Sequence, residues 1–395
     1  MRIRAATLNT WGLPDLFAED VAIRLREIGR RLPQLDLDAI AFQEVWTAHA
    51  QRLLVDAGVR AGLDHAWHAD SGLRSSGLLV LSRHPIESVR FEGFLLHGDP
   101  SVGDYYGGKG FAEVSLTTPA GPLTLVDTHL HARYASSVSH QYRAHRIGQI
   151  VQLAASAVSV RGPLLVGGDF NLEEGHEEYG VLLGLTGLRD AAAEVNRREP
   201  TVTRDNPYRT RSSKGDRRID LLLARSGVET GVRLHHVERV FDEFFDYSGR
   251  RLACSNHAGV LAELDLEPGA GAPPPATDSA AVATASRLLA QGTALARGQR
   301  SDGRVAAGLG LGTALVASAG LRTGAITRRR LLRGALRTAG VAALAPVLGF
   351  SFVSEIVAPD ELRALDALAG RLAQLADPEH ASARDPLSAG RRSGS

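Results

Sequence analysis

Acidic, amide and histidine side chains recur in this chain at points where short apolar runs end. Asp169 and Asn171 follow the apolar run of residues 163–168, Glu44 ends another run, and His257 precedes a third. Because open sheets build their sites beyond strand ends, we expect these side chains to converge in space. An acid, an amide and a histidine in one place provide the metal ligands and acid–base groups that metal-dependent phosphodiester hydrolysis requires.

Glu44 is the best candidate for a metal ligand. A hard divalent cation such as Mg²⁺ prefers oxygen ligands, often one or two carboxylates together with water and a substrate phosphate. Mn²⁺ is a substitute that accepts similar ligands. An acidic cap for the helix expected from Thr47 is the alternative interpretation of Glu44. Asn9 follows a strand expected at residues 2–8. It could orient Glu44 or touch the metal-bound phosphate, and a turn residue is its alternative interpretation.

Four further residues suit the chemistry of a water attacking a phosphodiester. Asp169 and Asn171 suit holding the water and donating to the phosphate, and an Asx turn is their alternative interpretation. His257 suits general acid–base catalysis, and Asp220 could fix its tautomer as a neighbouring carboxylate. A structural histidine is the alternative for His257. We favour catalysis because an acid, a metal ligand and an oriented base all have candidates.

The segments around residues 103–110 and 127–131 supply more polar candidates. His129 follows a strand expected at residues 123–126 and could donate to a phosphoryl oxygen as charge develops there. His131 is a second candidate for substrate binding, with solvated polar surface as its alternative. Residues 103–110 are rich in glycine and contain Lys109, which could reach a phosphate as a point charge. No Ser or Thr follows Lys109, so the segment is not a Walker loop.

The pattern of elements predicts a layered α+β fold. Residues 19–32 and 139–157 have the apolar period of amphipathic helices, whereas residues 232–240 and 259–266 have the pattern of strands. Strands outnumber helices and several neighbours look antiparallel, which favours a sandwich over a simple βαβ winding. The predicted organisation is a catalytic domain at 1–266, a Pro/Gly-rich linker at 267–280, and a helical tail at 281–395.

The overall composition narrows the classes of partner and compartment. The 395 residues carry a formal net charge of +1, and 44% of them are hydrophobic. A near-neutral, lysine-poor chain is not typical of a nucleic-acid-binding protein, so we expect no nucleic acid partner. One cysteine excludes an intramolecular disulfide and a cysteine-based zinc cluster. The N-terminal residues contain no apolar segment of the kind that begins a secretory signal.

Together these motifs resemble the endonuclease/exonuclease/phosphatase superfamily, and within it the neutral sphingomyelinases. The resemblance covers about residues 1–264. At the superfamily level it rests on Asn9, the Gln43-Glu44 pair, the Gly-Asp-Phe-Asn motif of residues 168–171, Asp220 and His257. At the sphingomyelinase level it rests on residues 8–14, 43–46, 82–86, 128–134 and 144–146, together with an Asp104/Lys109 pair near the catalytic centre.

The resemblance implies a four-layer α/β/β/α sandwich of the DNase I-like type. It also implies Mg²⁺-dependent hydrolysis of sphingomyelin to ceramide and phosphocholine, with Glu44 as the metal ligand beside Asn9. His257 would be the base paired with Asp220, Asp169 and Asn171 would manage water and phosphate, and His129 would contact the phosphate. Asn256 stands where the family usually has aspartate, which would weaken activity or alter metal use.

Other activities remain open at this level. Another phospholipid, an inositol phosphate or DNA is the alternative substrate within the superfamily. A weakened enzyme that serves as a lipid-binding scaffold is the alternative to catalysis, and it rests on Asn256.

The tail contains two uncharged segments, 305–321 and 338–354, separated by a segment with six arginines. Each is at the short limit for a spanning helix. A spanning hairpin would resemble the C-terminal hairpin of some eukaryotic neutral sphingomyelinases. If the enzyme were cytoplasmic, however, the six arginines between the two segments would lie on the far side of the membrane, against the positive-inside rule. We therefore expect a helical tail lying on the membrane surface, with the catalytic domain in the cytoplasm. A soluble Ala-rich helical domain is the alternative.

Overall fold

The computed structural model describes residues 1–72, 75–133, 139–209, 215–321 and 330–377. The chain divides into two compact units, one comprising Met1–Ser286 and the chain from Arg371, the other comprising Arg287–Gly370. The division after Ser286 differs from the predicted boundaries at residues 266 and 280. It falls inside α7 (Ser279–Gly320), which is one helix and belongs in part to each unit. The functional division at those boundaries stays a prediction.

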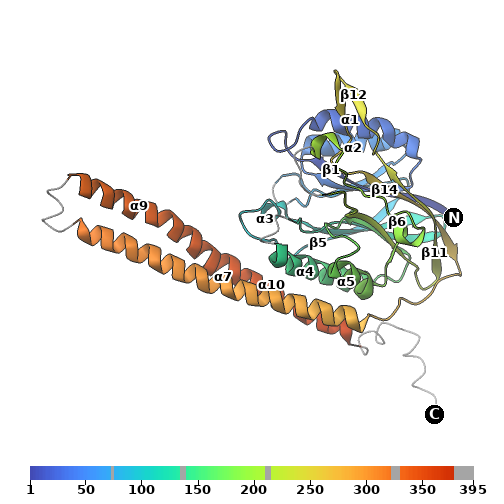
Figure 1. Cartoon of the computed structure of the whole chain (residues 1–395). Coiled ribbons are helices and arrows are strands. Elements are labelled where there is room, and N and C mark those ends of the chain that lie inside the picture. Colours follow the sequence, from blue (N-terminus) through green and yellow to red (C-terminus); the bar gives the residue numbers. More distant parts are fainter. Residues whose placement is uncertain (73–74, 134–138, 210–214, 322–329, 378–395) are drawn as a thin grey trace, which may run out of the picture. The chain divides into compact units, whose positions relative to one another are not determined.

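Two six-stranded mixed sheets form the centre of the larger unit (Figure 1). The first sheet has the order β11 (Thr230–Val240), β14 (Gly259–Pro268), β1 (Arg2–Gly12), β2 (Ala39–Val45), β4 (Leu79–Ser82) and β3 (His65–His68). The second has the order β5 (Ile86–Gly93), β6 (Gly110–Thr118), β7 (Gly121–His129), β8 (Leu164–Asp169), β10 (Asp220–Arg225) and β9 (Arg189–Asp190). A separate hairpin pairs β12 (Phe245–Tyr247) with β13 (Arg250–Leu252).

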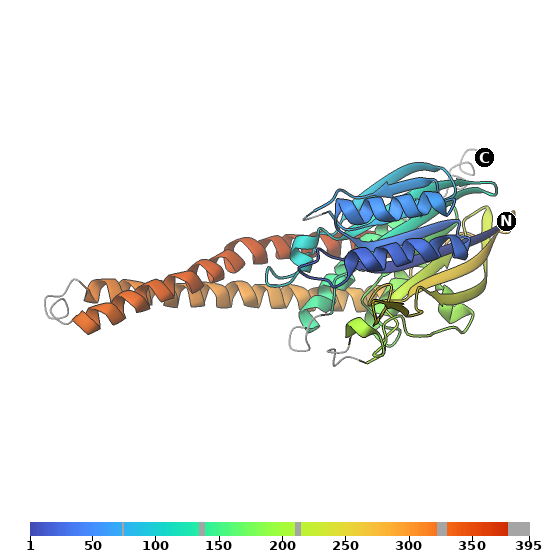
Figure 2. The ribbon, with the colours of Figure 1, turned by 90° about the horizontal axis from the view of Figure 1, so that it is seen from above.

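Helices cover the outer faces of both sheets. Figure 1 shows α1 (Val21–Arg31) and α2 (Ala48–Arg60) over the sheet that contains β1, and Figure 2 shows these two helices side by side. On the other side of the sandwich lie α4 (Ser139–Ala157) and α5 (Glu177–Thr186). The shorter helices are α3 (Asp104–Gly107), α6 (Ala191–Glu194), η1 (Leu32–Leu35) and η2 (Pro207–Arg209). This arrangement is the predicted four-layer α/β/β/α sandwich.

Alternation along β1 divides its side chains between two cores. Ile3 and Ala5 belong to the core between the sheets, whereas Ala6 and Leu8 pack in the core beneath α1 and α2. Thr7 continues the row of side chains that faces the second sheet. The two sheets approach closely there, since a Cβ added to Gly167 would lie 3.1 Å from the Thr7 Cβ. Polar side chains one or two residues further along the strands therefore face one another across the two sheets.

Several strands extend further than the apolar runs that predict them. β1 runs to Gly12 rather than ending at residue 8, and β7 runs to His129 rather than ending at residue 126. Backbone pairing continues through the polar residues, since Asn9 pairs with Gln43 and His129 with Asp169. The glycine-rich segment at 103–110 includes the one-turn helix α3, which ends before Lys109.

The smaller unit consists of helices. It contains most of α7, together with α9 (Arg330–Phe352), the π-helical turn η3 (Val353–Val357) and most of α10 (Ala358–Ala376). Helices α7 and α9 run side by side in both views (Figures 1 and 2). Gly303 permits close approach, because a Cβ there would lie 3.0 Å from the Ser354 Cβ. No helix within the described ranges has both the length and the apolar content that a membrane crossing requires.

Candidate active site

The strand register of the second sheet brings three predicted site residues into one row. His129 of β7 pairs with Asp169 of β8 in parallel register, and Asp169 pairs with Asp220 of β10 in antiparallel register. Neighbouring strands lie about 4.8 Å apart, so the three side chains are close enough to interact directly. All three are buried.

Asn9 links this row to the first sheet. Its Nδ2 donates to Glu44 Oε1 and to Asp169 Oδ2, each at 3.0 Å. Glu44 follows Gln43, and regular alternation would aim the two side chains in opposite directions. A left-handed φ of 60° at Glu44 breaks the alternation, so that its carboxylate faces Asn9. The alternative interpretation of Glu44 as a helix cap is wrong, because Thr47 caps α2 by accepting from the Ala50 amide.

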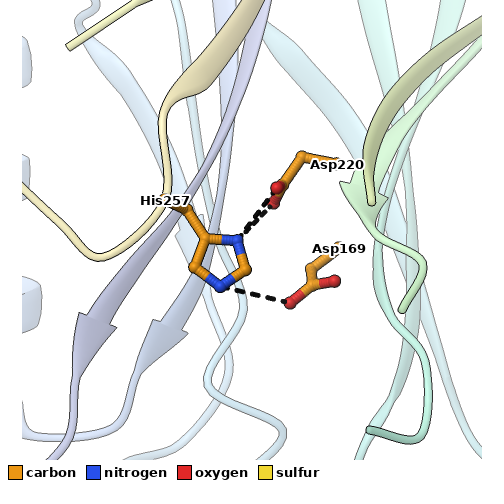
Figure 3. Close-up of side chains that lie close together, drawn as sticks. All are labelled: Asp169, Asp220 and His257. Carbon is orange, nitrogen blue, oxygen red and sulfur yellow. Dashed lines mark hydrogen bonds and ion pairs between the residues drawn. The ribbon is translucent and has the colours of Figure 1, made fainter. Parts of the chain in front are cut away.

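His257 lies between two carboxylates (Figure 3). Its Nδ1 is 2.9 Å from Asp220 Oδ2, and its Nε2 is 4.0 Å from Asp169 Oδ2. Burial opposes protonation of the ring, but attraction and hydrogen bonding from Asp220 outweigh it and raise the pKa of His257 to about 9. Burial and the nearby charge of Asp220 raise the pKa of Asp169 to about 6. The imidazole is thus a strong base whose orientation is set by Asp220.

The segment before β14 is anchored to the tip of β1. Ser255 Oγ donates to the Asn9 carbonyl at 2.7 Å, and the His257 amide donates to Ser255 Oγ at 3.2 Å. On the other side, Thr201 Oγ1 donates to Asp220 Oδ2 at 2.5 Å. Asn256 does not line the cavity described below, so its amide does not replace any group on the cavity wall.

Asp169 and Asn171 form a local turn while both face the cavity. The Asn171 amide donates to Asp169 Oδ1 at 3.0 Å, and Asn171 has a left-handed φ of 52°. The Asn171 Nδ2 donates to the Leu130 carbonyl at 3.1 Å. The Asx turn is therefore present, and it fixes the direction in which both side chains point.

Lys109 uses its ammonium group to join several site residues. Its Nζ pairs with Asp104 Oδ1 and donates to His129 Nε2 at 2.9 Å and to the Leu130 carbonyl at 3.0 Å. Burial alone would raise the pKa of Asp104, but attraction from Lys109 lowers it. Burial and the Lys109 charge together lower the pKa of His129 well below its usual value. Since an ammonium only donates, Nε2 of His129 is the acceptor and the ring is neutral.

His131 lies beside Asp104 but behind the wall of the cavity described below. Its ring is fully buried, stacks on Tyr142 with centroids 4.3 Å apart, and lies 3.6 Å from Asp104 Oδ2. Burial lowers the pKa of His131 to about 3. The side chain does not line the cavity, so its predicted contact with substrate stays a prediction that this placement does not favour.

A cavity of about 840 Å³ opens above these groups. Its floor is polar and includes Glu44, Asp169, Asn171, His257, His129 and Lys109. Its walls and mouth are largely apolar and include Leu13, Pro14, Phe17, Trp46, Ala48 and Tyr106. A polar floor beneath apolar walls fits an amphiphilic ligand whose charged part reaches the floor.

Two buried polar groups beneath the site were not expected from the sequence. Arg24 of α1 is fully buried and donates to the backbone carbonyls of Thr10, Trp11 and Glu19, at 2.7 to 2.8 Å. An arginine on the apolar face of a predicted amphipathic helix is the signal that could have identified it. Asp127 accepts from Gln43 Nε2 at 2.7 Å across the two sheets, and burial raises its pKa well above the usual value.

The described geometry agrees with a family model for the Endonuclease/Exonuclease/phosphatase family, which matches residues 6–257. The chain belongs to this family. The match begins in β1, before Asn9, and ends at His257, so it contains every site residue discussed above.

Relatives within the family include proteins named for sphingolipid hydrolysis. A putative neutral sphingomyelinase of Drosophila melanogaster is 28% identical over 276 residues, which are 67% of this chain and 61% of that protein. Human sphingomyelin phosphodiesterase 2 is 32% identical over 203 residues, 49% of this chain and 47% of that protein. Inositol phosphosphingolipids phospholipase C of Schizosaccharomyces pombe is 32% identical over 178 residues, 43% of this chain and 41% of that protein. The chain thus spans less than two thirds of the length of these three relatives.

Solved structures confirm the fold. Sphingomyelinase C from Streptomyces griseocarneus superposes with a TM-score of 0.51 at 18% identity, over 67% of this chain and 99% of that chain. Truncated Caenorhabditis elegans TDP2 gives a TM-score of 0.51 at 16% identity, over 67% of this chain and 97% of that chain. At these identities the likeness concerns the arrangement of strands and helices.

Proposed function

We propose that this family member hydrolyses the phosphodiester bond of a membrane phospholipid with the help of Mg²⁺. The substrate we propose is sphingomyelin, and the products are ceramide and phosphocholine. The single observation that carries the proposal is the cavity, whose floor holds the acid, amide and histidine groups of phosphodiester chemistry and whose walls are apolar. A water-soluble phosphodiester would not require such walls.

The donor set at Glu44 fits a hard divalent cation. Its carboxylate lines the cavity, receives the Asn9 amide, and forms no ion pair with a lysine or arginine among the described residues. The cluster of Asp169, Asp220 and His257 is a second group whose ligand atoms lie within 4.8 Å of one another. We favour Glu44, because His257 is already paired with Asp220 and Mg²⁺ prefers oxygen ligands. Mg²⁺ bound there would polarise a phosphoryl oxygen and offset developing negative charge.

His257 is the proposed general base. With Nδ1 donating its proton to Asp220, the lone pair of Nε2 is directed toward Asp169 and the cavity floor. A water held by Asp169 and Asn171 would give a proton to this Nε2 as its oxygen attacks phosphorus. The bond from phosphorus to the ceramide oxygen breaks, that oxygen takes a proton from solvent water, and the proton held by His257 later passes to solvent. Asp220 stabilises the imidazolium that results.

His129 and Lys109 are proposed to stabilise the phosphoryl group. The pairing of Lys109 with Asp104 holds the ammonium at the cavity floor, and His129 lies beside it. Because their positions are set by neighbouring groups, little rearrangement is needed when negative charge develops. For His129 to donate from Nε2, the ring must adopt the tautomer protonated at Nε2, and Lys109 must turn its own proton toward another acceptor, such as a substrate oxygen.

The choice of sphingomyelin rests on the relatives together with the cavity. Two of the three relatives described above are named for sphingomyelin or sphingomyelinase activity, and the third for inositol phosphosphingolipids. All three names concern lipids in which a phosphodiester joins a headgroup to a sphingolipid. We therefore propose a sphingolipid substrate and choose phosphocholine as its headgroup.

We also propose that the helical unit contacts a membrane. Exposed apolar side chains lie along both long helices, among them Val305, Leu309, Leu315 and Val316 on α7 and Val341, Leu348 and Phe350 on α9. Large exposed apolar surface is costly in water and is typical of interaction sites. A unit that lies on the bilayer surface would keep the catalytic unit in the cytoplasm beside its substrate.

The test is product release by the full chain from vesicles, with Mg²⁺ present. Phosphatidylcholine shares the headgroup of sphingomyelin, an inositol phosphosphingolipid shares its ceramide, and plasmid DNA shares neither. Phosphocholine release from sphingomyelin alone would support the proposed reaction and headgroup. Cleavage of the inositol lipid alone would correct the headgroup, and cleavage of DNA alone would contradict a lipid substrate.

A further inference from the structure

The loop that follows β1 exposes apolar side chains at the mouth of the cavity. Leu16 is 85% exposed and Phe17 is 67% exposed. Phe17 also lines the cavity with Leu13 and Pro14, so the loop is part of the cavity wall. An isolated exposed leucine needs no explanation, but adjacent exposed residues that continue into a cavity form a patch that does.

The loop is held in this conformation by buried groups. Arg24 donates through Nη2 to the Trp11 carbonyl at 2.7 Å and through Nε to the Glu19 carbonyl at 2.8 Å. These two bonds fasten both ends of the loop to one buried guanidinium. Within the loop, the Phe17 amide donates to the Pro14 carbonyl at 2.8 Å, and Ala18 is buried. The fold therefore holds Leu16 and Phe17 outward, although their apolar character would favour burial.

A second element contributes an exposed apolar side chain to the cavity. Tyr106 of α3 is 45% exposed and lines the cavity, and its hydroxyl donates to the Pro100 carbonyl at 3.0 Å. Trp46 also lines the cavity, and its ring lies against Gly77 and Gly107. Apolar side chains from several elements thus line the cavity, and those of Phe17 and Tyr106 are exposed at the surface.

The charges beside the loop indicate what kind of surface it fits. Asp15 and Glu19 are exposed, and residues 13–19 contain no lysine or arginine. A strongly anionic membrane would repel these carboxylates, whereas a zwitterionic surface would not. Contact through this loop would rest on apolar burial, which salt does not screen.

We propose that the loop at residues 13–18, together with Tyr106, inserts into the interface of a zwitterionic bilayer and so places the cavity mouth against the lipid. The proposal rests on the proposed function, because the cavity behind the loop is the one that would receive the lipid phosphodiester. A protein partner is the alternative occupant, but continuity between the patch and the cavity wall favours the source of the substrate itself. With Leu16 and Phe17 inserted, the cavity mouth lies at the bilayer, so the lipid phosphodiester can enter the cavity while the rest of the lipid stays in the membrane.

The direct test is an environment-sensitive fluorophore attached at Leu16→Cys in the full chain. The only native cysteine, Cys254, is fully buried and burial raises its pKa to about 12, so it does not compete for the label. Val59→Cys is the matched control, because Val59 is 54% exposed but lies near the end of α2 remote from the cavity. On adding phosphatidylcholine–sphingomyelin vesicles, we expect a blue shift at position 16 and none at 59, at low and at high salt.

This readout is independent of turnover and of any membrane contact by the helical unit. Bound protein without a shift at position 16, or an equal shift at both positions, would overturn the proposal. Failure of the protein to bind the vesicles would overturn it also. A shift at position 16 without cleavage of any lipid would leave the insertion standing and would contradict the proposed function instead.

A kinetic comparison provides the second test. Leu16 does not line the cavity, so Leu16→Ser should leave hydrolysis of water-soluble 4-nitrophenyl phosphorylcholine unchanged. On vesicles we expect kcat/KM to fall about tenfold, as the loss of one buried leucine predicts. Val59→Ser should match the wild type on both substrates. Equal losses on soluble and vesicular substrate would show that Leu16 supports the fold rather than the interface.

Discussion

The floor and the mouth of the cavity depart from the usual distribution of residues in opposite directions. At the floor, charged side chains such as Asp169 and Lys109 are buried. At the mouth, Leu16 and Phe17 are exposed. Burying charge and exposing apolar surface both lower stability unless something compensates. Two such departures in one cavity are what the two proposals require, charge chemistry at the floor and contact with lipid at the mouth.

The two regions are also held in place differently. Strand register and direct pairing position the floor, as in the row from His129 through Asp169 to Asp220. The mouth is a loop fastened at its two ends by one arginine. We therefore expect changes at the floor to abolish chemistry on every substrate and changes at the mouth to affect only substrate in a bilayer. The following predictions test that separation.

The largest effect is expected for His257→Gln. Removing the general base should lower kcat by about 10³-fold on both soluble and vesicular substrate. The matched control is His84→Gln, since His84 is also buried and lies 3.2 Å from a carboxylate, Asp38, but does not line the cavity. Steady-state turnover of both substrates measures this. Selective loss on vesicles alone would contradict the separation of floor and mouth.

Lys109→Met should have the next largest effect, on stability. It leaves the buried carboxylate of Asp104 without its cation, which costs about 3 kcal/mol of unfolding free energy. The double variant Lys109→Met with Asp104→Asn should recover most of that loss. Urea unfolding followed by tryptophan fluorescence measures it, because Trp11, Trp46 and Trp67 all lie in the larger unit. If the double variant recovers no stability, the loss of the Lys109–Asp104 ion pair is not the source of the destabilisation.

Asp220→Asn should lower turnover about tenfold to a hundredfold and shift its pH dependence. The pKa of His257 is raised to about 9 chiefly by Asp220, so a neutral residue at 220 should lower it. A base acts when deprotonated, so the rising limb of the pH–rate profile should move toward lower pH. Profiles of kcat/KM for wild type and variant measure the shift. A limb that stays in place would exclude His257 as the titrating base.

The smallest effect is expected beneath the floor, at Asp127→Asn. Burial raises the pKa of Asp127, so the folded state retains a proton that the unfolded chain loses near pH 3.8. Stability is then lost as pH rises toward the folded-state pKa. Between pH 5 and pH 8 the variant should therefore lose less stability than the wild type. Thermal unfolding measures this, and Asp64→Asn, at an exposed position, should behave like the wild type.

Much of the fold and the main site residues could be predicted because they follow local patterns. Apolar runs ending in polar residues located β2 and β8 well, and the helix predicted at residues 139–157 has those bounds. β3, a four-residue strand, was not predicted because so short a segment carries little periodicity. The uncharged segment at 305–321 was interpreted by itself, whereas its residues 305–320 form the C-terminal part of α7, one helix of 42 residues.

Contacts between distant segments explain what the sequence could not predict. Gln43 and Asp127 are 84 residues apart and meet only because the two sheets pack face to face. The outward direction of Leu16 and Phe17 depends on Arg24, which lies on a different element. A local pattern also cannot show whether a turn residue faces a cavity. Asn171 forms the Asx turn and faces the cavity at once.

The most direct test of the proposed metal site is the Mg²⁺ dependence of soluble phosphodiester hydrolysis by wild type and by Glu44→Gln. The soluble substrate removes the mouth from the comparison, and the amide oxygen introduced by the substitution could still accept from Asn9, so the fold should be intact. We predict turnover that saturates with Mg²⁺ and disappears with EDTA in the wild type, and a loss of at least about 10²-fold in the variant. Mg²⁺-dependent turnover retained by Glu44→Gln would contradict the assignment of the floor as the metal site.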